Sequence, residues 1–391
     1  MSWRDGSVVA VTDAWGGQAG AVVVTVALSG AAVETGGAVE TGAVTGGAVE
    51  TGGTAGTVRA LAYPAVVGTP VPGDRVLLNT RALDAGLGTG GYALVVALPD
   101  RLPEAPSAAG VAGDGHLVKD RYSPLQQSVA GADEQGSVWH EALREADDLR
   151  GMPVVVADLH SALPAVVAGI RAHDPSLRVV YVMSDGGALP MAFSRTAAAL
   201  RAAGWLAATV TTGQAWGGEL EAVTVHSGLL AARIAADADV AVLTQGPGNL
   251  GTGTRWGFSG VAAGEAVNAA GVLGGRPVAA LRVSTADPRP RHRGVSHHSL
   301  TAYGRVALLP ADVVVPVLPG DLTGLGATLR EQASVLGARH RLVEVATDGL
   351  AAAVRAAPLA VSSMGRGYDA DPACFLTSAA AGRHAAHLAT G

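Results

Sequence analysis

The sequence predicts a small N-terminal all-β domain, followed by an α/β domain built on a doubly wound, mostly parallel sheet. Three observations support this. Short valine-rich runs, separated by turn residues, fill the first hundred residues. From Val154 onward, longer apolar runs alternate with helix-like segments. Polar clusters directly follow most of these later runs, as they do where parallel strands end at a ligand crevice.

The all-β domain is expected to span residues 1–98 and to form a barrel or a sandwich. Its predicted strands are Val8–Val11, Ala21–Leu28, Val58–Ala62, Arg75–Leu78 and Tyr92–Leu98. Residues 31–57 interrupt them with a degenerate Val-Glu-Thr-Gly-Gly-Ala repeat. Because this stretch is rich in glycine and has no bulky side chain, we expect a low-complexity loop insertion that carries no chemistry.

Residues 99–150 are expected to link the two domains. Their first part, residues 99–115, is rich in proline, glycine and alanine, which is typical of a linker. The following stretch HLVKDRYSPLQQ, residues 116–127, is more distinctive in composition.

The α/β domain is expected to span residues 151–391 in three layers. Its apolar runs have the continuous character of buried parallel strands: Val154–Ala157, Arg178–Met183, Ala207–Thr211, Val240–Thr244, Val278–Val283, Val313–Val317 and Arg341–Val345. Helices are predicted over 194–203, 227–236 and 259–273, each with its first serine as N-cap, and over 371–390. Right-handed crossovers then place helices on both faces of the sheet.

Composition limits the function classes. The chain has 391 residues, of which 49% are hydrophobic and 15% charged, so it is not intrinsically disordered. A net charge of −6 argues against nucleic-acid binding. The single cysteine, Cys374, excludes an internal disulfide and a cysteine-based zinc site. The absence of a signal-peptide pattern and of an uncharged apolar run of about 18 residues predicts a cytoplasmic protein without a membrane partner. A homo-oligomer stays open.

Five polar clusters follow predicted strands: Asp158–Ser161, Ser184–Gly187, Gly213–Glu219, Gln245–Thr254 and Ser284–Ser299. Carboxyl ends of parallel strands share one edge of a sheet, so these clusters should converge on one small-molecule crevice. We therefore expect one crevice to be lined by His160, Asp185, His226, Asn249 and His297.

The glycine-rich stretch fits the G-x-G-x-x-G pattern with Gly246, Gly248 and Gly251. The following helix, however, begins only near Ser259, and no acidic residue ends the next strand, so NAD binding is not expected. The backbone of this loop is instead expected to hold an anionic group. The candidate ligand-binding residues are Gly246, Gly248, Asn249, Gly251, Thr252, Gly253 and Thr254. The alternative is close packing of small residues.

The densest polar cluster lies at residues 287–299. Arg289, Arg291 and Arg293 are candidates for holding the substrate's charge, because guanidinium groups bind carboxylates and phosphates. His297 or His298 is the candidate proton carrier. The two prolines suggest an extended loop, in which these adjacent histidines would point in opposite directions. The alternative is a solvated basic loop.

Two carboxylates and one further histidine complete the catalytic hypothesis. Asp185 or Asp158 would orient the proton-carrying histidine, and His160 is a further catalytic candidate.

A divalent metal and a nucleophilic serine are two further hypotheses. Asp158 and His160 have the spacing of a ligand pair, and His226, His292, His297 and His298 are candidates to complete it for zinc, manganese or iron. No HExxH helix supports such a site. A covalent serine mechanism has weaker support because G-x-S-x-G is absent. Cys374 is expected to be buried and inert.

The long motifs resemble an actinobacterial family of unknown function, number 3866. The resemblance rests on Lys119–Gln126, Asp158–Ser161, Tyr181–Pro190, Val225–Arg233, Gly246–Gly260, Ala286–Ser299 and Met364–Gly367. It covers nearly the whole chain and supports the predicted domain boundaries, but it implies no activity and no catalytic residue. Gln214 stands where the family pattern suggests a histidine.

These observations together predict an enzyme, a hydrolase or a transferase, that acts by acid–base chemistry on a small anionic molecule. The alternative is a non-catalytic metabolite sensor or assembly protein that uses the same crevice. Catalysis needs a titratable group within reach of the substrate, whereas a sensor needs only complementary donors.

Overall fold

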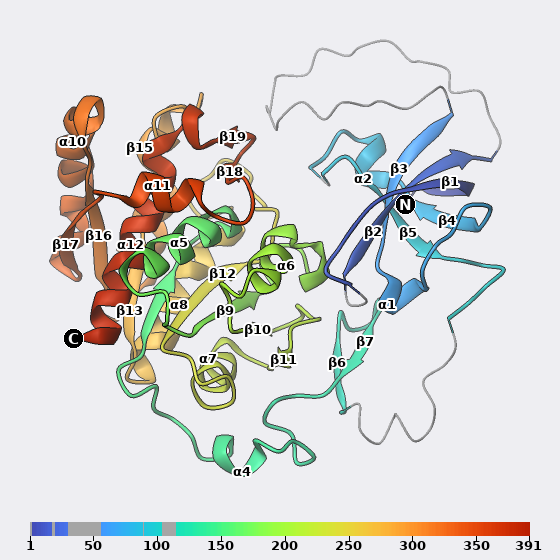
Figure 1. The fold of residues 1–391 in the computed structure, drawn as a ribbon, viewed down its shortest axis with the longest axis horizontal. Helices are drawn as coiled ribbons and strands as arrows, with labels where there is room; N and C mark the ends of the chain where they lie inside the picture. Colours follow the sequence, from blue (N-terminus) through green and yellow to red (C-terminus); the bar gives the residue numbers. More distant parts are fainter. Residues whose placement is uncertain (1, 18–19, 30–55, 89, 104–114) are drawn as a thin grey trace. The chain divides into compact units, whose positions relative to one another are not determined.

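The computed structural model describes residues 2–17, 20–29, 56–88, 90–103 and 115–391 (Figure 1). Nearly all of the predicted loop insertion at residues 31–57 lies outside the described residues. The chain divides into two compact units, one formed by residues 1–110 and 123–125 and the other by residues 111–122 and 126–391.

The smaller unit is a closed five-stranded barrel with strand order β1-β2-β3-β5-β4. All neighbouring strands are antiparallel except β3 and β5, which are parallel. The strands are β1 (Trp3–Trp15), β2 (Ala21–Leu28), β3 (Thr57–Ala62), β4 (Arg75–Asn79) and β5 (Ala93–Ala97). Each of the five valine-rich runs therefore forms a strand, and the barrel alternative is confirmed. Two one-turn helices, α1 (Pro64–Val67) and α2 (Arg81–Asp84), lie between strands.

The larger unit is built on an eight-stranded sheet with order β11-β10-β9-β12-β8-β13-β16-β17, in which every neighbouring pair is parallel. Its strands are β8 (Pro153–Val156), β9 (Val179–Ser184), β10 (Ala208–Thr211), β11 (Leu220–Glu221), β12 (Val240–Gln245), β13 (Arg276–Ala280), β16 (Asp312–Val317) and β17 (Arg341–Ala346). All seven apolar runs predicted as strands belong to this sheet. Its central strands are buried along almost their whole length, as the continuous apolar runs indicated.

The direction in which the chain adds successive strands to the sheet reverses between the neighbouring strands β8 and β12. From β8 the chain continues to β9, which lies beyond β12, whereas from β12 it continues to β13, which lies beyond β8. In open parallel sheets such a reversal opens a crevice at the carboxyl ends of the two strands. The sheet order therefore singles out one place for a ligand.

Helices connect the strands and pack on the sheet. They are α4 (His140–Leu143), α5 (Leu163–His173), α6 (Arg195–Ala202), α7 (Val225–Ile234), α8 (Ala262–Val272), α9 (His297–Thr301), α10 (Thr323–Ala333), α11 (Leu350–Arg355) and α12 (Pro372–Thr390). Helices α5 and α12 approach closely, because a Cβ atom on Gly169 would lie 1.9 Å from the carbonyl oxygen of Ala379.

The predicted helix starts are only partly correct. Ser194 caps α6 and accepts a hydrogen bond from the Ala197 amide. Ser227 is not the N-cap of α7, because Thr224 caps that helix and Ser227 completes a capping box with it. Ser259 instead begins a 3-10 turn ahead of α8.

Residues of the predicted connecting segment form regular structure in the larger unit. β6 (Leu117–Lys119) pairs with β7 (Gln127–Val129). The buried Lys119 ammonium group donates to the carbonyl oxygens of Thr211 and Ala215 and to the Glu221 carboxylate. This lysine therefore ties β6 to the ends of β10 and β11.

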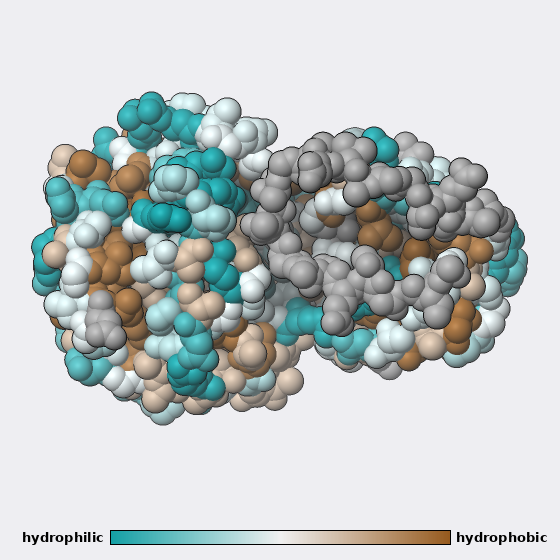
Figure 2. All heavy atoms as spheres, turned by 90° about the horizontal axis from the view of Figure 1, so that it is seen from above, coloured by the Kyte–Doolittle hydropathy of each residue, from teal (hydrophilic) through white to brown (hydrophobic). Residues whose placement is uncertain are grey.

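Two further antiparallel strand pairs complete the unit: β14 (Val283–Ser284) with β15 (Gly294–Val295), and β18 (Ser362–Ser363) with β19 (Arg366–Gly367). On the face of this unit drawn in Figure 2, hydrophilic and hydrophobic residues are interspersed. No helix among the described residues is both long enough and apolar enough to cross a bilayer.

Candidate active site at the ends of β8, β12 and β13

A buried ionic group lies at the carboxyl ends of β8 and β13. Asp158 follows β8 by two residues, and Arg282 follows β13 by two residues. The Asp158 oxygen Oδ2 lies 3.8 Å from Nη1 of Arg282 and 3.4 Å from Nδ1 of His298. Arg282 Nη1 is also 3.0 Å from that histidine nitrogen. Asp158 is only 3% exposed, so these charges interact away from water.

Three side-chain atoms of this region are buried without a hydrogen-bond partner among the described residues: Oδ2 of Asp158, Oε1 of Gln245 and Nε2 of His297. Folded proteins pair almost all of their buried polar atoms, so each of these exceptions needs an explanation.

Helix α9 brings the two adjacent histidines to the same side. Ser296 is its N-cap, and its hydroxyl oxygen accepts from the His298 amide and lies 2.8 Å from Nδ1 of His292. His297 and His298 are the first two residues of this helix. The prediction that they lie in an extended loop and point apart is therefore wrong, because the serine cap starts a helix there.

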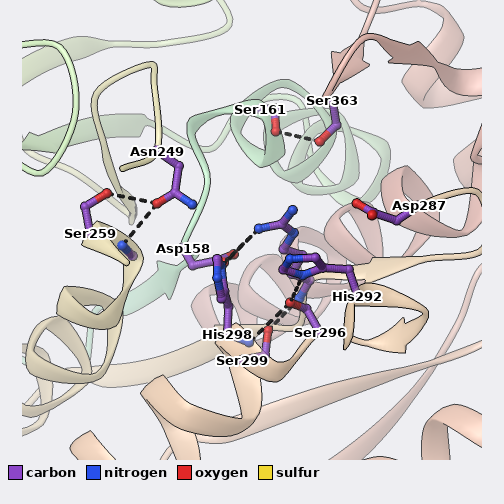
Figure 3. A network of polar contacts seen from close by, with 12 residues as sticks. Asp158, Ser161, Asn249, Ser259, Asp287, His292, Ser296, His298, Ser299 and Ser363 are labelled. Carbon is purple, nitrogen blue, oxygen red and sulfur yellow. Dashed lines mark hydrogen bonds and ion pairs between the residues drawn. The ribbon is translucent and has the colours of Figure 1, made fainter. Parts of the chain in front are cut away.

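His292, His297 and His298 form a three-histidine cluster. One ring nitrogen from each lies within 4.8 Å of the other two. Figure 3 shows His292, His298 and Asp158 next to one another. The His298 ring also stacks on Phe258, with ring centroids 3.7 Å apart. Phe258 thus supplies an apolar wall that holds the His298 ring in place.

Two histidines of the cluster have strongly lowered pKa values. Burial, followed by repulsion from Arg282, lowers the pKa of His292 to about 3. Burial, followed by repulsion from His298 and then Arg291, lowers the pKa of His297 to about 4. Both rings are therefore neutral at pH 7 and expose lone pairs rather than positive charge.

The loop after β12 is anchored to the same place. Asn249 Oδ1 accepts hydrogen bonds from Gln245 Nε2, the Ser259 hydroxyl and the Gly260 amide. Gln245 Nε2 also donates to the backbone oxygen of Asp158, 2.9 Å away. Asn249 thus holds the loop in place, because its side-chain oxygen Oδ1 accepts all three of these hydrogen bonds.

The predicted glycines of this loop have different roles. A Cβ atom on Gly246 would lie 2.3 Å from the carbonyl oxygen of Ala188, so this glycine allows the loops after β9 and β12 to pack together. Gly248 and Gly253 have positive φ angles of 91° and 78°. The remaining predicted loop residues, Gly251, Thr252 and Thr254, are exposed, with the two threonine hydroxyls 3.2 Å apart.

The three predicted arginines also differ. Arg289 makes two side-chain hydrogen bonds to Asp287, and Arg293 donates to the Asp287 carbonyl oxygen. Although burial opposes it, the Arg289 hydrogen bonds hold the pKa of Asp287 below its ordinary value. Arg291 is exposed and makes no ion pair within the described parts of the chain. Its Nη2 lies 3.6 Å from the position that a Cβ atom on Gly253 would occupy.

His160 is buried among hydrogen-bond partners. Its Nδ1 lies 2.9 Å from the Tyr181 hydroxyl, and its Nε2 lies 2.8 Å from the Ser194 hydroxyl. Both ring nitrogens are occupied, and burial lowers the pKa of His160 to about 4. In this arrangement, His160 has no nitrogen left for a metal ion or for proton transfer.

Two other predicted site residues, Asp185 and His226, have contacts different from those of the three-histidine cluster. Asp185 accepts from the Gln214 amide, 2.8 Å away. His226 is exposed in the first turn of α7. Neither has an ion pair or hydrogen bond with the three-histidine cluster in the described structure. Of the five residues expected to line one crevice, His297 belongs to this cluster, and Asn249 is linked to Asp158 through Gln245.

Sequence reasoning missed Arg282 and Phe258. Arg282 interrupts the apolar run VAALRV, and a charged residue within such a run is an available signal for a buried partner. Phe258 carries no comparable signal, because its contact with His298 depends on the path of the loop after β12.

The serine and cysteine candidates are already engaged or unreactive. The Ser299 hydroxyl accepts from the Arg282 amide, and Ser296 is the helix cap. Cys374 is half-buried rather than fully buried as expected, and desolvation raises the pKa of its thiol to about 12.

Comparisons with known proteins identify the family. Searches of the curated proteins and of the solved structures found no match. Residues 59–382 match the family model described as "Protein of unknown function (DUF3866)". This match spans β3 through most of α12, including every residue of the site described above. The chain therefore belongs to the DUF3866 family.

Proposed function

We propose that this protein is an enzyme that hydrolyses a small anionic molecule, or transfers a group from it, at the carboxyl ends of β8, β12 and β13. One observation carries the proposal: Asp158 Oδ2 and His297 Nε2 are buried without partners beside a cluster of ring nitrogens. Polar atoms that a fold leaves unpaired at a strand end are typical of a site prepared for a ligand.

The position in the sheet supports the same conclusion. β8 and β12 are the neighbouring strands at which the direction of strand addition reverses. With right-handed crossovers, their following helices α5 and α8 would lie on opposite faces, which is the doubly wound arrangement. Small-molecule sites of doubly wound sheets lie at this reversal.

Arg291 supports an anionic substrate. Its neighbours Arg289 and Arg293 are committed to Asp287, whereas Arg291 has no ionic partner among the described residues. A guanidinium can hold a carboxylate or phosphate through two parallel hydrogen bonds. After burial and repulsion from His298, the positive charge of Arg291 is the next cause that lowers the pKa of His297. We assign Arg291 to the anionic group and the three histidines to the reacting end.

A binding and turnover experiment tests this function. The full chain would be titrated calorimetrically with inorganic phosphate and with acetate, and assayed with 4-nitrophenyl phosphate and 4-nitrophenyl acetate. Arg291→Gln should weaken anion binding and raise KM about 10- to 100-fold, as expected for loss of a charge-assisted hydrogen bond worth about 1.5–3 kcal/mol. The matched control is Arg305→Gln, which changes another exposed arginine of the same unit and should have no effect.

The outcomes separate the alternatives. Turnover that depends on Arg291 supports the enzyme. Anion binding that depends on Arg291, without turnover of any probe, favours the metabolite sensor and contradicts the enzyme. Equal behaviour of the two arginine variants would contradict the assignment of the anion site.

A further inference from the structure

We propose that His292, His297 and His298 bind one divalent transition-metal ion, with zinc as the best match. The inference deepens the proposed function, and the catalytic meaning of the ion rests on it. The binding site itself rests on geometry, on the unpaired nitrogen of His297 and on the chemistry of the donors.

The spacing of the ring nitrogens fits an ion after a small movement. Three atoms within 4.8 Å of one another lie at most about 2.8 Å from a common centre, and zinc–nitrogen bonds are about 2.0–2.1 Å long. Each ring therefore needs to move inward by less than about 1 Å. The first turn of a short helix and the adjacent 3-10 turn at Pro290–His292 supply all three rings.

We assign the Nε2 atom of each ring to the ion, because the described contacts use Nδ1 in two of the three rings. His292 uses Nδ1 for the contact with the Ser296 hydroxyl, and His298 uses Nδ1 for its contacts with Arg282 and Asp158. Nε2 of His297 is buried and has no partner in the described structure. Histidine ligands of metals commonly keep one nitrogen for a second partner that fixes the ring.

Metal binding would exchange the hydrogen-bond partners of His298. A guanidinium can only donate, so the 3.0 Å contact with Arg282 needs an unprotonated Nδ1 and a proton on Nε2. An ion on Nε2 requires the proton to move to Nδ1. There it can be donated to Asp158 Oδ2, which lies 3.4 Å away and has no hydrogen-bond partner.

The same exchange frees Arg282 from His298. Its Nη1 is 3.8 Å from the Asp158 oxygen, so a small shift forms a direct ion pair. Binding would thus pair the unpaired carboxylate oxygen as well as the unpaired His297 nitrogen. One ligand would account for two of the three buried unpaired atoms of this region.

The donor set indicates the class of ion. Neutral imidazoles suit zinc, copper, iron and nickel rather than magnesium or calcium. Three histidines leave a fourth position of a tetrahedral ion open to water, the arrangement of catalytic rather than structural zinc sites. The ion lowers the pKa of that water to about 7 and so supplies hydroxide at neutral pH.

The resulting hydrolysis needs only water. The hydroxide oxygen bonds to the electrophilic phosphorus or carbon of the substrate, and the bond to the leaving group breaks. The leaving group takes that electron pair and receives the proton that the water lost. Arg291 would hold a second anionic oxygen of the substrate during this step.

The test measures metal affinity directly. The full chain would be stripped with dipicolinate and titrated with Zn²⁺ against a chromophoric chelator, and Co²⁺ would be added separately to record its visible spectrum. We expect one ion per chain and the intense Co²⁺ absorption of a four-coordinate site. Loss of a residue that hydrogen-bonds a metal ligand typically lowers metal affinity 10- to 100-fold. Because His297→Asn removes a ligand itself, it should lower Zn²⁺ affinity at least about 100-fold.

His226→Asn is the matched control, because His226 is exposed on α7 and should leave the affinity unchanged. Circular dichroism and thermal unfolding would check that each variant is folded. A measurement without any substitution guards against misfolding: Zn²⁺ should shift the ring ¹⁵N resonances of the three histidines of the cluster, but not those of the exposed His226.

Failure of this inference and failure of the proposed function are distinguishable. Absence of stoichiometric Zn²⁺ or Co²⁺ binding, or equal affinity of the His297 and His226 variants, overturns the metal site, while Arg291-dependent turnover would still support the enzyme. One bound ion that depends on His297, without anion binding or turnover, supports the metal site and contradicts the proposed function.

Discussion

The Asp158 oxygen Oδ2 lies 3.4 Å from Nδ1 of His298 and makes no hydrogen bond with it in the described structure. Asp158 lies two residues after β8, and His298 is the second residue of α9, much later in the chain. The two groups meet because β8 and β13 are neighbours in the sheet. The carboxylate is thus poised to orient the ring once a proton sits on Nδ1.

Replacing Asp158 with asparagine should lower Zn²⁺ affinity about 10- to 100-fold, because the charged partner of a metal-binding histidine is lost. Competition with a chromophoric chelator measures the change. Asp312→Asn is the control, since Asp312 forms a comparable pair with His384, 2.7 Å away, at the start of β16. Similar affinity for the two variants would show that Asp158 does not act on the cluster.

The stability of the protein should depend on pH through His160. Its folded-state pKa of about 4 lies below the ordinary value of 6.5, so the unfolded chain binds the proton more readily. The contribution is fully present above pH 6.5 and is lost as the pH falls toward 4, by about 1.4 kcal/mol per pH unit and about 3 kcal/mol in total. Denaturant unfolding of the wild type and of His160→Gln between pH 7 and 4 measures it. Identical pH slopes would contradict a buried neutral ring.

Two glycines of the loop after β12 should respond differently to alanine. Gly246→Ala places a methyl group 2.3 Å from the Ala188 carbonyl oxygen and should cost about 1–3 kcal/mol of unfolding free energy. Gly251→Ala meets its nearest atom only at 3.9 Å and should change stability by less than about 0.5 kcal/mol. Chemical denaturation compares them. Equal costs would show that Gly246 is not a packing residue.

The buried ion pair of Lys119 and Glu221 should be indispensable to the fold. Burial lowers the pKa of Lys119, and Glu221 opposes this shift at 2.7 Å. Lys119→Met should destabilise the protein by about 3–5 kcal/mol, because it leaves a buried carboxylate without its charge partner. Adding Glu221→Gln should recover part of the loss. A double variant that shows the sum of both single costs would contradict direct pairing.

The sequence alone predicted most of the strands of both units. Valine-rich runs with turn residues between them predicted the barrel strands, and continuous apolar runs predicted the parallel sheet. These features depend on local periodicity, which a sequence displays directly. The same logic predicted a site at the strand ends, because the carboxyl ends of parallel strands share an edge.

Tertiary structure decided which strand-end residues share a site. Strand order puts β13 beside β8, and this brings Asp158 to Arg282 and His298 rather than to His160, which bonds Tyr181 and Ser194. The Ser296 cap turns a stretch expected to be extended into a helix, so His297 and His298 face one centre. Local sequence patterns predict neither outcome. The first depends on how the strands are ordered in space. The second depends on whether the Ser296 hydroxyl caps a helix at His297.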